Sequence, residues 1–521
     1  MKFTRNDSLS TIENTKEWDI AIIGGGATGL GIAVDAASRG YKTLLIEKHD
    51  FAKGTSSKST KLVHGGVRYL ANGDVKLVIS ALKERGLIFK NAPHVSFVQG
   101  FVIPSYNIFS KYKFLIGLKL YDWLAGRLRI GKSTLLSKKE VINKLPKVNQ
   151  KNLIGGIQYF DGQFDDARLA LNLGQTACEH GATILNYAEV TGILKNGEGK
   201  VEGIEFVDRD TNKKYTVKAK AVINATGIFV DDILKLDTAT HKNLVRPSQG
   251  THIVIDKKFL GKEDALMIPE TSDGRVLFGV PWHDKVLLGT TDTPLNEHKI
   301  EPRPLEEEIE FILNTAADYL ENPPTRKDVL SVFAGLRPLA APKDNDGNST
   351  KEISRDHKLI KSDSDLITIT GGKWTTYRKM AEETVDMAIA VGKLIPKDCK
   401  TPHLPIHGYS TEKRAGHWQV YGSDAEKIQA LVKENPSLGN KLHPDFEFIE
   451  AEVIWSCRNE MIYNVEDFLA RRVRFLLLDA KASLQAAPRV AQLMAQELGK
   501  DQAWIDAQLE SYKNLVANYT L

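Results

Sequence analysis

The stretch WDIAIIGGGATGLGIAVDAASRGYKTLLIEKHD, residues 18–50, decides the fold. Residues 19–23 form a short apolar run typical of a buried strand, and residues 27–39 carry apolar side chains at helical spacing. Gly40 ends the helical pattern, and residues 42–46 form a second strand-like run. This order of strand, helix and strand predicts a βαβ unit, from which parallel sheets are built.

The first turn of this unit carries the glycine pattern of a dinucleotide site. Gly24, Gly26 and Gly29 form GxGxxG between the first strand and the helix. We expect Gly24 to allow the tight turn, Gly26 to admit a pyrophosphate and Gly29 to let the helix pack on the strand. Glu47 ends the second strand, where an acidic side chain can bind a ribose hydroxyl. A purely structural glycine-rich turn is the alternative interpretation.

Two later segments favour a flavin. GxGxxG does not distinguish FAD from NAD, but it occurs once and near the N-terminus, which suggests one permanently bound cofactor. AVINATG, residues 221–227, predicts a strand that ends in a turn of small residues. LITITGGKWTTYRKMAEETVDMAI, residues 366–389, predicts a strand, a Gly-Gly turn and an amphipathic helix that begins near residues 373–375. The N-terminal amides of that helix would suit the edge of a flavin ring, where negative charge develops on reduction.

The composition is that of an intracellular, multidomain globular protein. A chain of 521 residues is too long for one compact core, so we expect two or three domains. The net charge of +4 is too small to indicate nucleic-acid binding. Cys178, Cys399 and Cys457 lie far apart, which predicts neither a disulfide framework nor a metal site. The N-terminus lacks the apolar core of a secretory signal, and no apolar run reaches the roughly 18 residues of a membrane span.

The order of these patterns predicts three domains. We expect a discontinuous dinucleotide-binding domain from residues 1–95, 161–240 and 345–400, a substrate domain from 96–160 and 241–344, and a helical domain from 401–521. The strand-like runs THIVI, RVLFGVPW and KVLLGTTD suggest that the substrate domain is an antiparallel sheet. Helical periodicity dominates the last 100 residues or so, as in EDFLARRVRFLLL, residues 466–478.

Two long segments and a series of short ones carry a family resemblance. IIGGGATGLGIAVDAASRG and GTSSKSTKLVHGGVRYL, residues 22–40 and 54–70, resemble the FAD-dependent glycerol-3-phosphate dehydrogenase family. Further matches follow in the family's order: DDARL from residue 165, NATG from 224, GTHIVI from 250, LLGTTD from 287, GLRPL from 335, ISRD from 353, GGKWTTYRK from 371 and EDFLARRVR from 466. The resemblance implies an α/β plus α fold: a glutathione-reductase-like Rossmann FAD domain, an inserted antiparallel β-sheet substrate domain and a C-terminal helical domain.

The resemblance also implies a reaction and a set of cofactor contacts. The family oxidises sn-glycerol 3-phosphate to dihydroxyacetone phosphate by hydride transfer to flavin N5 and passes the electrons to a membrane quinone. The residues expected to contact FAD are Gly24, Gly26, Ala27, Thr28, Gly29, Glu47, Thr55, Ser56, Ser57, Thr60, Lys61, Leu62, His64, Gly65, Gly66, Val190, Ala225, Thr226, Gly227, Gly335, Gly372, Lys373, Trp374 and Thr375. The small hydroxyl side chains among them can crowd round a dinucleotide, and we expect the backbone of residues 64–66 to lie against the flavin ring. Lys58 is assigned no role.

A phosphorylated substrate requires cationic side chains. The resemblance implies that Arg68, Arg355 and Lys373 bind the phosphate, because guanidinium and ammonium groups donate charge-assisted hydrogen bonds to it. A surface ion pair is the alternative, above all for Arg355. Arg337 is expected beside the reacting alcohol oxygen. Tyr69 and Thr376 would add substrate-facing hydroxyls.

The hydroxyl proton of the substrate needs a base. A histidine suits this role because its ordinary pKa is near neutral. We choose His252 in GTHIVI and take His64, beside the cofactor glycines, as the rival. A histidine that only fills the core is the other alternative for His252.

The resemblance implies contact with a membrane surface, and residues 106–132 are the candidate segment. They combine aromatic and leucine side chains with six lysines and arginines, a composition that suits a helix lying in a lipid interface. An ordinary packing helix fits the composition equally well. We expect a cytoplasmic protein attached peripherally to the inner face of the cell membrane, a homodimer by resemblance, with glycerol 3-phosphate, quinone and lipid as partners. The alternatives are a soluble glycerol-3-phosphate oxidase that uses O₂, a flavin dehydrogenase of another small hydroxy substrate, and a flavin-binding sensor without catalysis.

Overall fold

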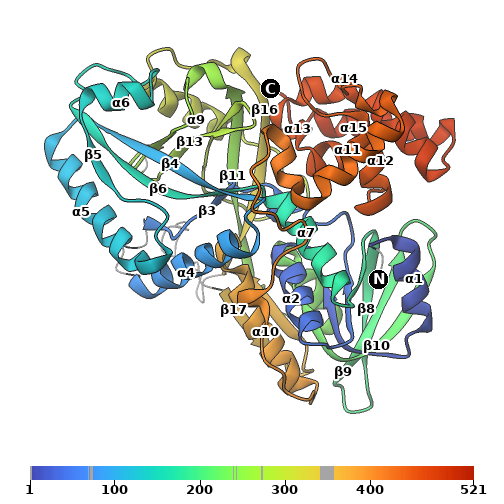
Figure 1. Cartoon of the computed structure of the whole chain (residues 1–521). Coiled ribbons are helices and arrows are strands. Elements are labelled where there is room, and N and C mark those ends of the chain that lie inside the picture. Colours follow the sequence, from blue (N-terminus) through green and yellow to red (C-terminus); the bar gives the residue numbers. More distant parts are fainter. Residues whose placement is uncertain are drawn as a thin grey trace.

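Two β-sheets and a helical domain make up the chain (Figure 1). The computed structural model describes residues 3–67, 70, 74–238, 240–241, 243–271, 274–340 and 357–521. The first sheet is mostly parallel and the second mostly antiparallel. The chain passes between the sheets several times, which makes both of them discontinuous in sequence.

The first sheet contains the predicted βαβ unit. Its strands run in the order β17–β18–β10–β1–β2–β7, with β18 to β7 parallel, and β9 and β8 extend it from β10. The strands are β1 (Glu17–Ile23), β2 (Thr43–Ile46), β7 (Thr183–Leu185), β8 (Ala188–Lys195), β9 (Val201–Asp208), β10 (Lys214–Asn224), β17 (His357–Lys361) and β18 (Ile367–Gly371). The carboxyl ends of the parallel strands share one edge, where ligands of such sheets bind.

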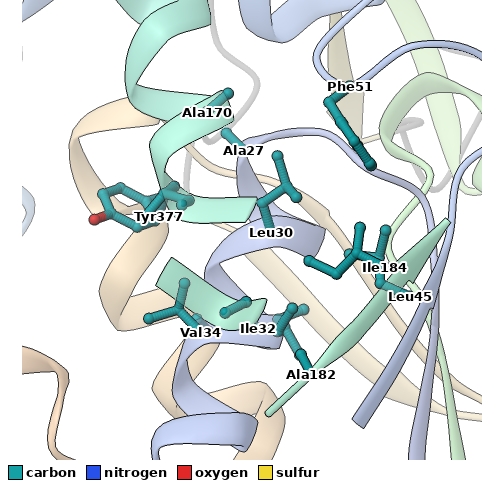
Figure 2. Close-up of a cluster of buried hydrophobic side chains, with 14 of the residues drawn as sticks. Ala27, Leu30, Ile32, Val34, Leu45, Phe51, Ala170, Ala182, Ile184 and Tyr377 are labelled. Atoms are coloured by element: carbon teal, nitrogen blue, oxygen red, sulfur yellow. The ribbon is translucent and has the colours of Figure 1, made fainter. Parts of the chain in front are cut away.

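Helices bury one face of the first sheet. They are α2 (Ala27–Ser38), α7 (Asp166–Glu179) and α10 (Tyr377–Val391), and α2 packs against both of the others. Figure 2 shows Leu30 of α2 beside Leu45 and Ile184 of the strands, in one cluster of buried apolar side chains. The β8–β9 hairpin covers the opposite face with Ile204 and Phe206. Helices α1 (Arg5–Asn14) and α8 (Val230–Asp237) complete this part.

The second sheet has the order β15–β11–β14–β13–β12–β4–β6–β3, with β16 added to β11 and β5 to β6. Its strands are β3 (Leu62–Val63), β4 (Ser96–Ser105), β5 (Thr134–Leu136), β6 (Gly155–Phe164), β11 (Val245–Asp256), β12 (Ala265–Ile268), β13 (Leu277–Trp282), β14 (Lys285–Gly289), β15 (Thr293–Pro294) and β16 (Val329–Ala340). All of these pairs are antiparallel except β4–β12, which is parallel and departs from the expected antiparallel sheet. Its helices are α4 (Val75–Asn91), α5 (Ile108–Ala125), α6 (Lys138–Lys144) and α9 (Glu306–Tyr319).

The C-terminal domain is helical, as predicted. It contains α11 (Ala425–Glu434), α12 (Glu450–Asn459), α13 (Phe475–Leu478), α14 (Ala480–Leu498) and α15 (Gln502–Val516). The periodic stretch 466–478 is not one regular helix, however. Residues 467–472 form a π-helical turn, Arg474 has a φ of 64°, and α13 has only four residues.

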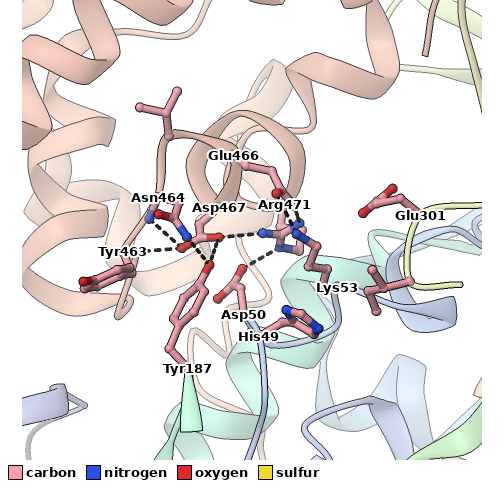
Figure 3. A network of polar contacts seen from close by, with 12 residues as sticks. His49, Asp50, Lys53, Tyr187, Glu301, Tyr463, Asn464, Glu466, Asp467 and Arg471 are labelled. Carbon is pink, nitrogen blue, oxygen red and sulfur yellow. Dashed lines mark hydrogen bonds and ion pairs between the residues drawn. The ribbon is translucent and has the colours of Figure 1, made fainter. Parts of the chain in front are cut away.

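Buried ion pairs explain that irregular stretch and join the domain to the first sheet. Arg471 lies 2.5 Å from Asp50 and 2.6 Å from Asp467, and Glu466 lies 2.7 Å from Lys53 (Figure 3). The Arg471–Asp50 and Glu466–Lys53 pairs cross the domain boundary, whereas Asp467 belongs to the same domain as Arg471. An unpaired buried charge is costly, so the backbone of this stretch adopts a geometry in which each of these charged side chains has a partner.

The predicted elements of the βαβ unit are confirmed as β1, α2 and β2, and the three strand-like runs lie in β11, β13 and β14. The proposed domain boundaries remain a prediction. Two strands differ from them: β3 falls within residues 1–95 but belongs to the second sheet, and β6 of the second sheet runs from Gly155 to Phe164, past the expected boundary at residue 160.

Candidate active site

A cavity of about 900 Å³ lies where the two sheets meet. The turns after β1, β2, β10 and β18 line it from the first sheet, and β11 and β16 line it from the second. The loop of residues 52–60 contributes a third side. The carboxyl ends of the parallel strands therefore open into this cavity, as expected for a dinucleotide fold.

The glycines of the first turn bring the backbone close to one side of the cavity. Gly24 has a φ of 108°, and a Cβ on it would lie 2.7 Å from the carbonyl oxygen of Ala225. A Cβ on Gly29 would collide with the carbonyl oxygen of Gly24, so this glycine lets α2 pack on the turn. Gly26 lines the cavity, and a Cβ there would meet Ser56 Oγ at 3.1 Å, with no other contact within 4 Å from described residues beyond its own turn. A side chain at Gly26 would therefore occupy space that a ligand can use.

Hydrogen bonds hold the hydroxyl-rich loop against this turn. Ser56 Oγ accepts a hydrogen bond from the Ala27 amide at 2.9 Å, and the Ser56 carbonyl accepts one from Trp374 Nε1 at 2.7 Å. Thr55 Oγ1 donates to the Leu336 carbonyl of β16 at 2.6 Å. The loop therefore connects the N-terminus of α2, the segment before α10 and the second sheet.

Glu47 lies at the expected end of β2. Its carboxylate accepts hydrogen bonds from the amides of Gly25 at 2.6 Å and His49 at 2.7 Å. Burial raises the pKa of Glu47, and these two amides oppose the change. The side chain lines the cavity and is held in one orientation, which suits a ribose-binding acid.

His252 lies on β11, with its ring in the cavity wall. Nε2 is 2.9 Å from Thr60 Oγ1, and the ring stacks on Phe333 of β16 at a centroid distance of 4.9 Å. Burial lowers the pKa of His252 well below its ordinary value, and the positive charges of Lys61 and Arg337 lower it further. The imidazole is consequently uncharged near pH 7, with one ring nitrogen unprotonated, and the same burial makes it a weaker base.

Arg337 reaches the same cavity from β16. The register pairs Gly250 of β11 with Gly335, and the guanidinium covers Gly250, whose missing side chain makes the room for it. The guanidinium donates to the Gln249 carbonyl at 3.3 Å and to Thr290 Oγ1 at 3.1 Å. Gly250 and His252 project from the same face of β11, so the predicted base and the predicted arginine are neighbours.

Most of the predicted site residues line this one cavity: Gly24, Gly26, Ala27, Thr28, Glu47, Thr55, Ser56, Thr60, Leu62, His64, Val190, Ala225, Thr226, Gly227, His252, Gly335, Arg337, Gly372, Lys373, Trp374 and Thr375. Residues from at least seven separate parts of the sequence thus meet in space. Arg68, Tyr69 and Arg355 lie outside the described residues.

Other predicted residues are placed away from the cavity. Lys61 is fully buried and donates to Asp166 at 2.7 Å and to the Ser57 carbonyl at 2.7 Å, so its side chain belongs to an internal ion pair. Gly65 packs on α4 and α5: its amide donates to Tyr121 Oη at 2.8 Å, and a Cβ there would lie 2.6 Å from Leu82. The hydroxyl of Thr376 donates to the Lys373 carbonyl at 3.2 Å. Lys61, Gly65 and Thr376 are absent from the cavity lining, as are Gly29, Ser57 and Gly66, and the contacts of all six with cofactor or substrate stay predictions.

The structure adds lining residues that the sequence analysis missed. Phe229 and Asp232 come from the segment after β10, and residues 298–300 come from the connection between β15 and α9. Gly250 could have been predicted from the sequence, because it lies two residues before His252 in a predicted strand and therefore on the same face. Residues 298–300 could not, since they belong to no motif and to no periodic element.

The lining fits a flavin dinucleotide. The glycine turn offers backbone at the N-terminus of α2 for a diphosphate, Glu47 lies where a ribose is bound, and Gly371 and Gly372 have positive φ where the backbone turns before α10. Basic side chains, among them Lys53 and Lys373, line the cavity. The donor set is therefore that of a phosphate-bearing cofactor.

Comparisons with known proteins agree with this geometry. Residues 19–377 match the family described as FAD dependent oxidoreductase, and residues 362–505 match the C-terminal domain of alpha-glycerophosphate oxidase. The mitochondrial glycerol-3-phosphate dehydrogenase of Schizosaccharomyces pombe is 39% identical, with 96% of this chain and 88% of that protein aligned. The human mitochondrial enzyme of the same name is also 39% identical, with 98% of this chain and 75% of that protein aligned. A solved glycerol-3-phosphate dehydrogenase from Bacillus halodurans, complexed with FAD, superimposes with a TM-score of 0.80 at 29% identity, covering 99% of this chain and 97% of that one.

Proposed function

Because the chain belongs to the FAD-dependent glycerol-3-phosphate dehydrogenase family, we propose that it oxidises sn-glycerol 3-phosphate to dihydroxyacetone phosphate and passes the electrons to a membrane quinone. One observation supports the proposal above all: His252 and Arg337 both line a cavity that also contains the glycine turn of a dinucleotide site. A base, a cation and a flavin site are the three parts that oxidation of a secondary alcohol requires.

The roles of the side chains follow from their positions. Bound FAD supplies the hydride acceptor. His252 is neutral, so its Nε2 can take the hydroxyl proton of the substrate once that hydroxyl replaces Thr60 as its partner. The Arg337 guanidinium is placed to polarise the same oxygen, and Lys373 adds positive charge for the phosphate.

An anaerobic reduction experiment tests the reaction. Glycerol 3-phosphate should bleach the flavin absorbance of the purified enzyme, whereas glycerol at the same concentration should not, because it lacks the dianion that the cations bind. Bleaching by both compounds would contradict phosphate recognition. A flavin that neither compound bleaches would support the sensor interpretation instead.

The surface of α5 supports the membrane part of the proposal. Phe109, Tyr112, Ile116, Leu120 and Trp123 recur at helical spacing, and each is between 43% and 80% exposed. Figure 1 shows α5 at the outer edge of the molecule, on the far side from the helical domain. Isolated exposed apolar side chains are ordinary, but a continuous stripe of large ones indicates an interaction surface.

The exposed stripe suits a helix that lies in a lipid interface. Lys113 and Lys119 are exposed on the same helix and would contact anionic headgroups. Among the described residues, no helix combines the length and the hydropathy needed to cross a bilayer. A surface-bound enzyme would have direct access to a quinone dissolved in the membrane.

The electron acceptor separates this proposal from the oxidase alternative. With glycerol 3-phosphate as the donor, a short-chain quinone analogue should be reduced much faster than O₂ is consumed. Stoichiometric formation of hydrogen peroxide, at a rate unaffected by the quinone analogue, would favour the oxidase.

A further inference from the structure

A surface segment leaves the second sheet, lines one side of the cavity and returns to the same sheet. We call residues 295–303 the strap. Its first residue is held on β11, where the Leu295 amide donates to the Pro247 carbonyl at 2.9 Å, and its last is held by Gln249 Nε2, which donates to the Arg303 carbonyl at 3.2 Å. Between these two points the strap leaves the sheet.

The middle of the strap lies between cavity and solvent. His298, Lys299 and Ile300 line the cavity, yet the side chains of Glu297 and Lys299 are 81% and 71% exposed. Ile300 faces the cofactor loop, since a Cβ on Gly54 would lie 3.6 Å from its Cδ1. The strap therefore forms part of the cavity wall and also carries solvent-exposed side chains.

One contact of the strap with the cofactor domain is a buried three-residue cluster. Glu301 Oε2 accepts hydrogen bonds from Lys58 Nζ at 2.6 Å and from Tyr519 Oη at 2.8 Å. Lys58 also donates to the Ile300 carbonyl at 3.1 Å, and its ammonium lies 6.0 Å from the centre of the Tyr519 ring. We call Lys58, Glu301 and Tyr519 the latch.

The latch joins three remote parts of the chain. Lys58 belongs to the cofactor loop, Glu301 to the strap and Tyr519 to the C-terminus, which is itself held on β16 by a 2.9 Å bond from the Val332 amide to the Tyr519 carbonyl. The side chains of Lys58 and Glu301 are only 5% and 16% exposed. Figure 3 shows Glu301 near Lys53, which belongs to the cofactor loop. Breaking a charge-assisted pair at such low exposure leaves its partner buried and unpaired, which costs more than breaking a surface ion pair.

The second contact is weaker and lies across the cavity mouth. His298 Nε2 is 3.1 Å from Asp232 Oδ2, and its ring meets that of Phe229 edge-on at 5.1 Å. The side chains of His298 and Asp232 are 29% and 49% exposed, so water screens this pair. The strap is thus fixed firmly at the latch and loosely at His298.

We propose that the latch holds the strap closed over the cofactor and that opening of the latch limits exchange of FAD with solution. The proposal rests on the binding of FAD in this cavity. Lys58, Glu301 and Tyr519 are then positioning residues, which govern retention of the cofactor without touching the reacting atoms.

Flavin release from the holoenzyme tests the proposal. Holoenzyme is diluted, and the rise of free-flavin fluorescence gives the release rate. Tyr519→Phe and Glu301→Gln should each release FAD roughly 10-fold faster than the wild type, because each removes a charge-assisted hydrogen bond of the latch. With FAD in excess, kcat of Tyr519→Phe should equal that of the wild type, since Tyr519 lies outside the cavity lining.

The chain offers a matched control. Tyr512 is also buried in the C-terminal domain, and its hydroxyl donates to Ser483 Oγ at 2.9 Å without reaching the strap. Tyr512→Phe should keep the wild-type release rate. His298→Ala, at the looser contact, should accelerate release less than the latch variants.

Two results would overturn the proposal: wild-type release from both latch variants, or equal acceleration by Tyr512→Phe, which would mean that general loosening of the helical domain controls release. The release assay needs no turnover. A protein that retains FAD but is not reduced by glycerol 3-phosphate would refute the proposed reaction and leave the latch testable.

Discussion

Thr60 Oγ1 lies 2.9 Å from His252 Nε2, and this bond joins the cofactor loop to the substrate sheet. Thr60 follows the residues that contact the turn at α2, whereas His252 stands on β11. Among the described residues, Nδ1 of the same ring is buried without a hydrogen-bond partner. The threonine is therefore the polar group that orients the imidazole before substrate binds.

Replacement of Thr60 tests this orientation. Thr60→Val keeps the shape but loses the hydroxyl, so we expect kcat to fall on the order of 10-fold, while Thr60→Ser retains most of it. FAD content, measured by absorbance, should stay near that of the wild type. A Thr60→Val enzyme with full kcat would show that stacking on Phe333 alone orients His252.

Lys61 should influence the pH at which His252 becomes protonated and can no longer act as the base. Its charge helps to lower the pKa of His252, second to burial, so Lys61→Gln should raise that pKa. His252 must be neutral to accept a proton, and the acid limb of kcat/KM should consequently move to higher pH in the variant. Profiles measured between pH 5 and 8 would show the shift. Lys53→Gln, which removes a cavity cation paired with Glu466, is the control and should leave the limb in place.

Gly250 should be essential for the position of Arg337. In Gly250→Ala the new methyl group would lie 2.7 Å from Cζ of the guanidinium, which must then move. We expect kcat/KM for glycerol 3-phosphate to fall on the order of 100-fold, because small displacements of a polarising group are costly. Gly279→Ala on β13 is a matched change, since the three atoms nearest to its Cβ would be side-chain carbons of Leu288, Leu266 and Val286, at 3.1 Å or more. Equal losses in both variants would point to damage of the sheet instead.

The sequence predicted best where local geometry and chemistry coincide. Gly24 and Gly29 were identifiable because the tight turn and helix packing need glycine at that spacing. His252 stood out as a polar ring in an apolar strand, and it lines the cavity, while its role as the base stays a prediction. These features depend on residues that are close together in the sequence, so they can be recognised from the sequence pattern alone.

Contacts between remote segments were not predictable in this way. Lys61 looked like a ligand donor, but its partner Asp166 lies 105 residues away. Gly65 looked like a flavin contact, but α5 fills the space beside it. The irregular backbone at Arg474 likewise follows from a 2.9 Å pair with Asp166 that no helical periodicity reveals.

The ion pairs of His407 should stabilise the fold, and this stabilisation should be lost at alkaline pH. This histidine bridges Glu179 at 2.5 Å and Asp424 at 2.8 Å, and although burial opposes the charge, these carboxylates raise the pKa of His407 to about 9. A raised folded-state pKa stabilises the fold fully below about pH 6.5, the unfolded value, and the contribution is lost as pH rises through about 9.

The matching experiment compares melting temperatures. The difference in Tm between the wild type and His407→Gln should be largest near pH 6. It should shrink as the pH rises from 6.5 to 9.5. A gap that is constant over this range would mean that His407 contributes by packing and not by charge.

The stripe on α5 should be required for binding to lipid. Phe109 and Trp123 are 80% and 74% exposed at opposite ends of the helix, so Phe109→Ser with Trp123→Ser removes two large anchors from the stripe without opening the core. We expect sedimentation with vesicles of anionic phospholipid to fall at least 10-fold, because interfacial binding scales with buried apolar area. Reduction of a water-soluble acceptor should be unchanged, whereas reduction of a quinone held in the vesicles should fall. Ile395→Ser is the control, since Ile395 is 79% exposed but lies outside the stripe, after α10. Vesicle binding that survives the double change, or that Ile395→Ser weakens equally, would place the lipid contact elsewhere on the molecule.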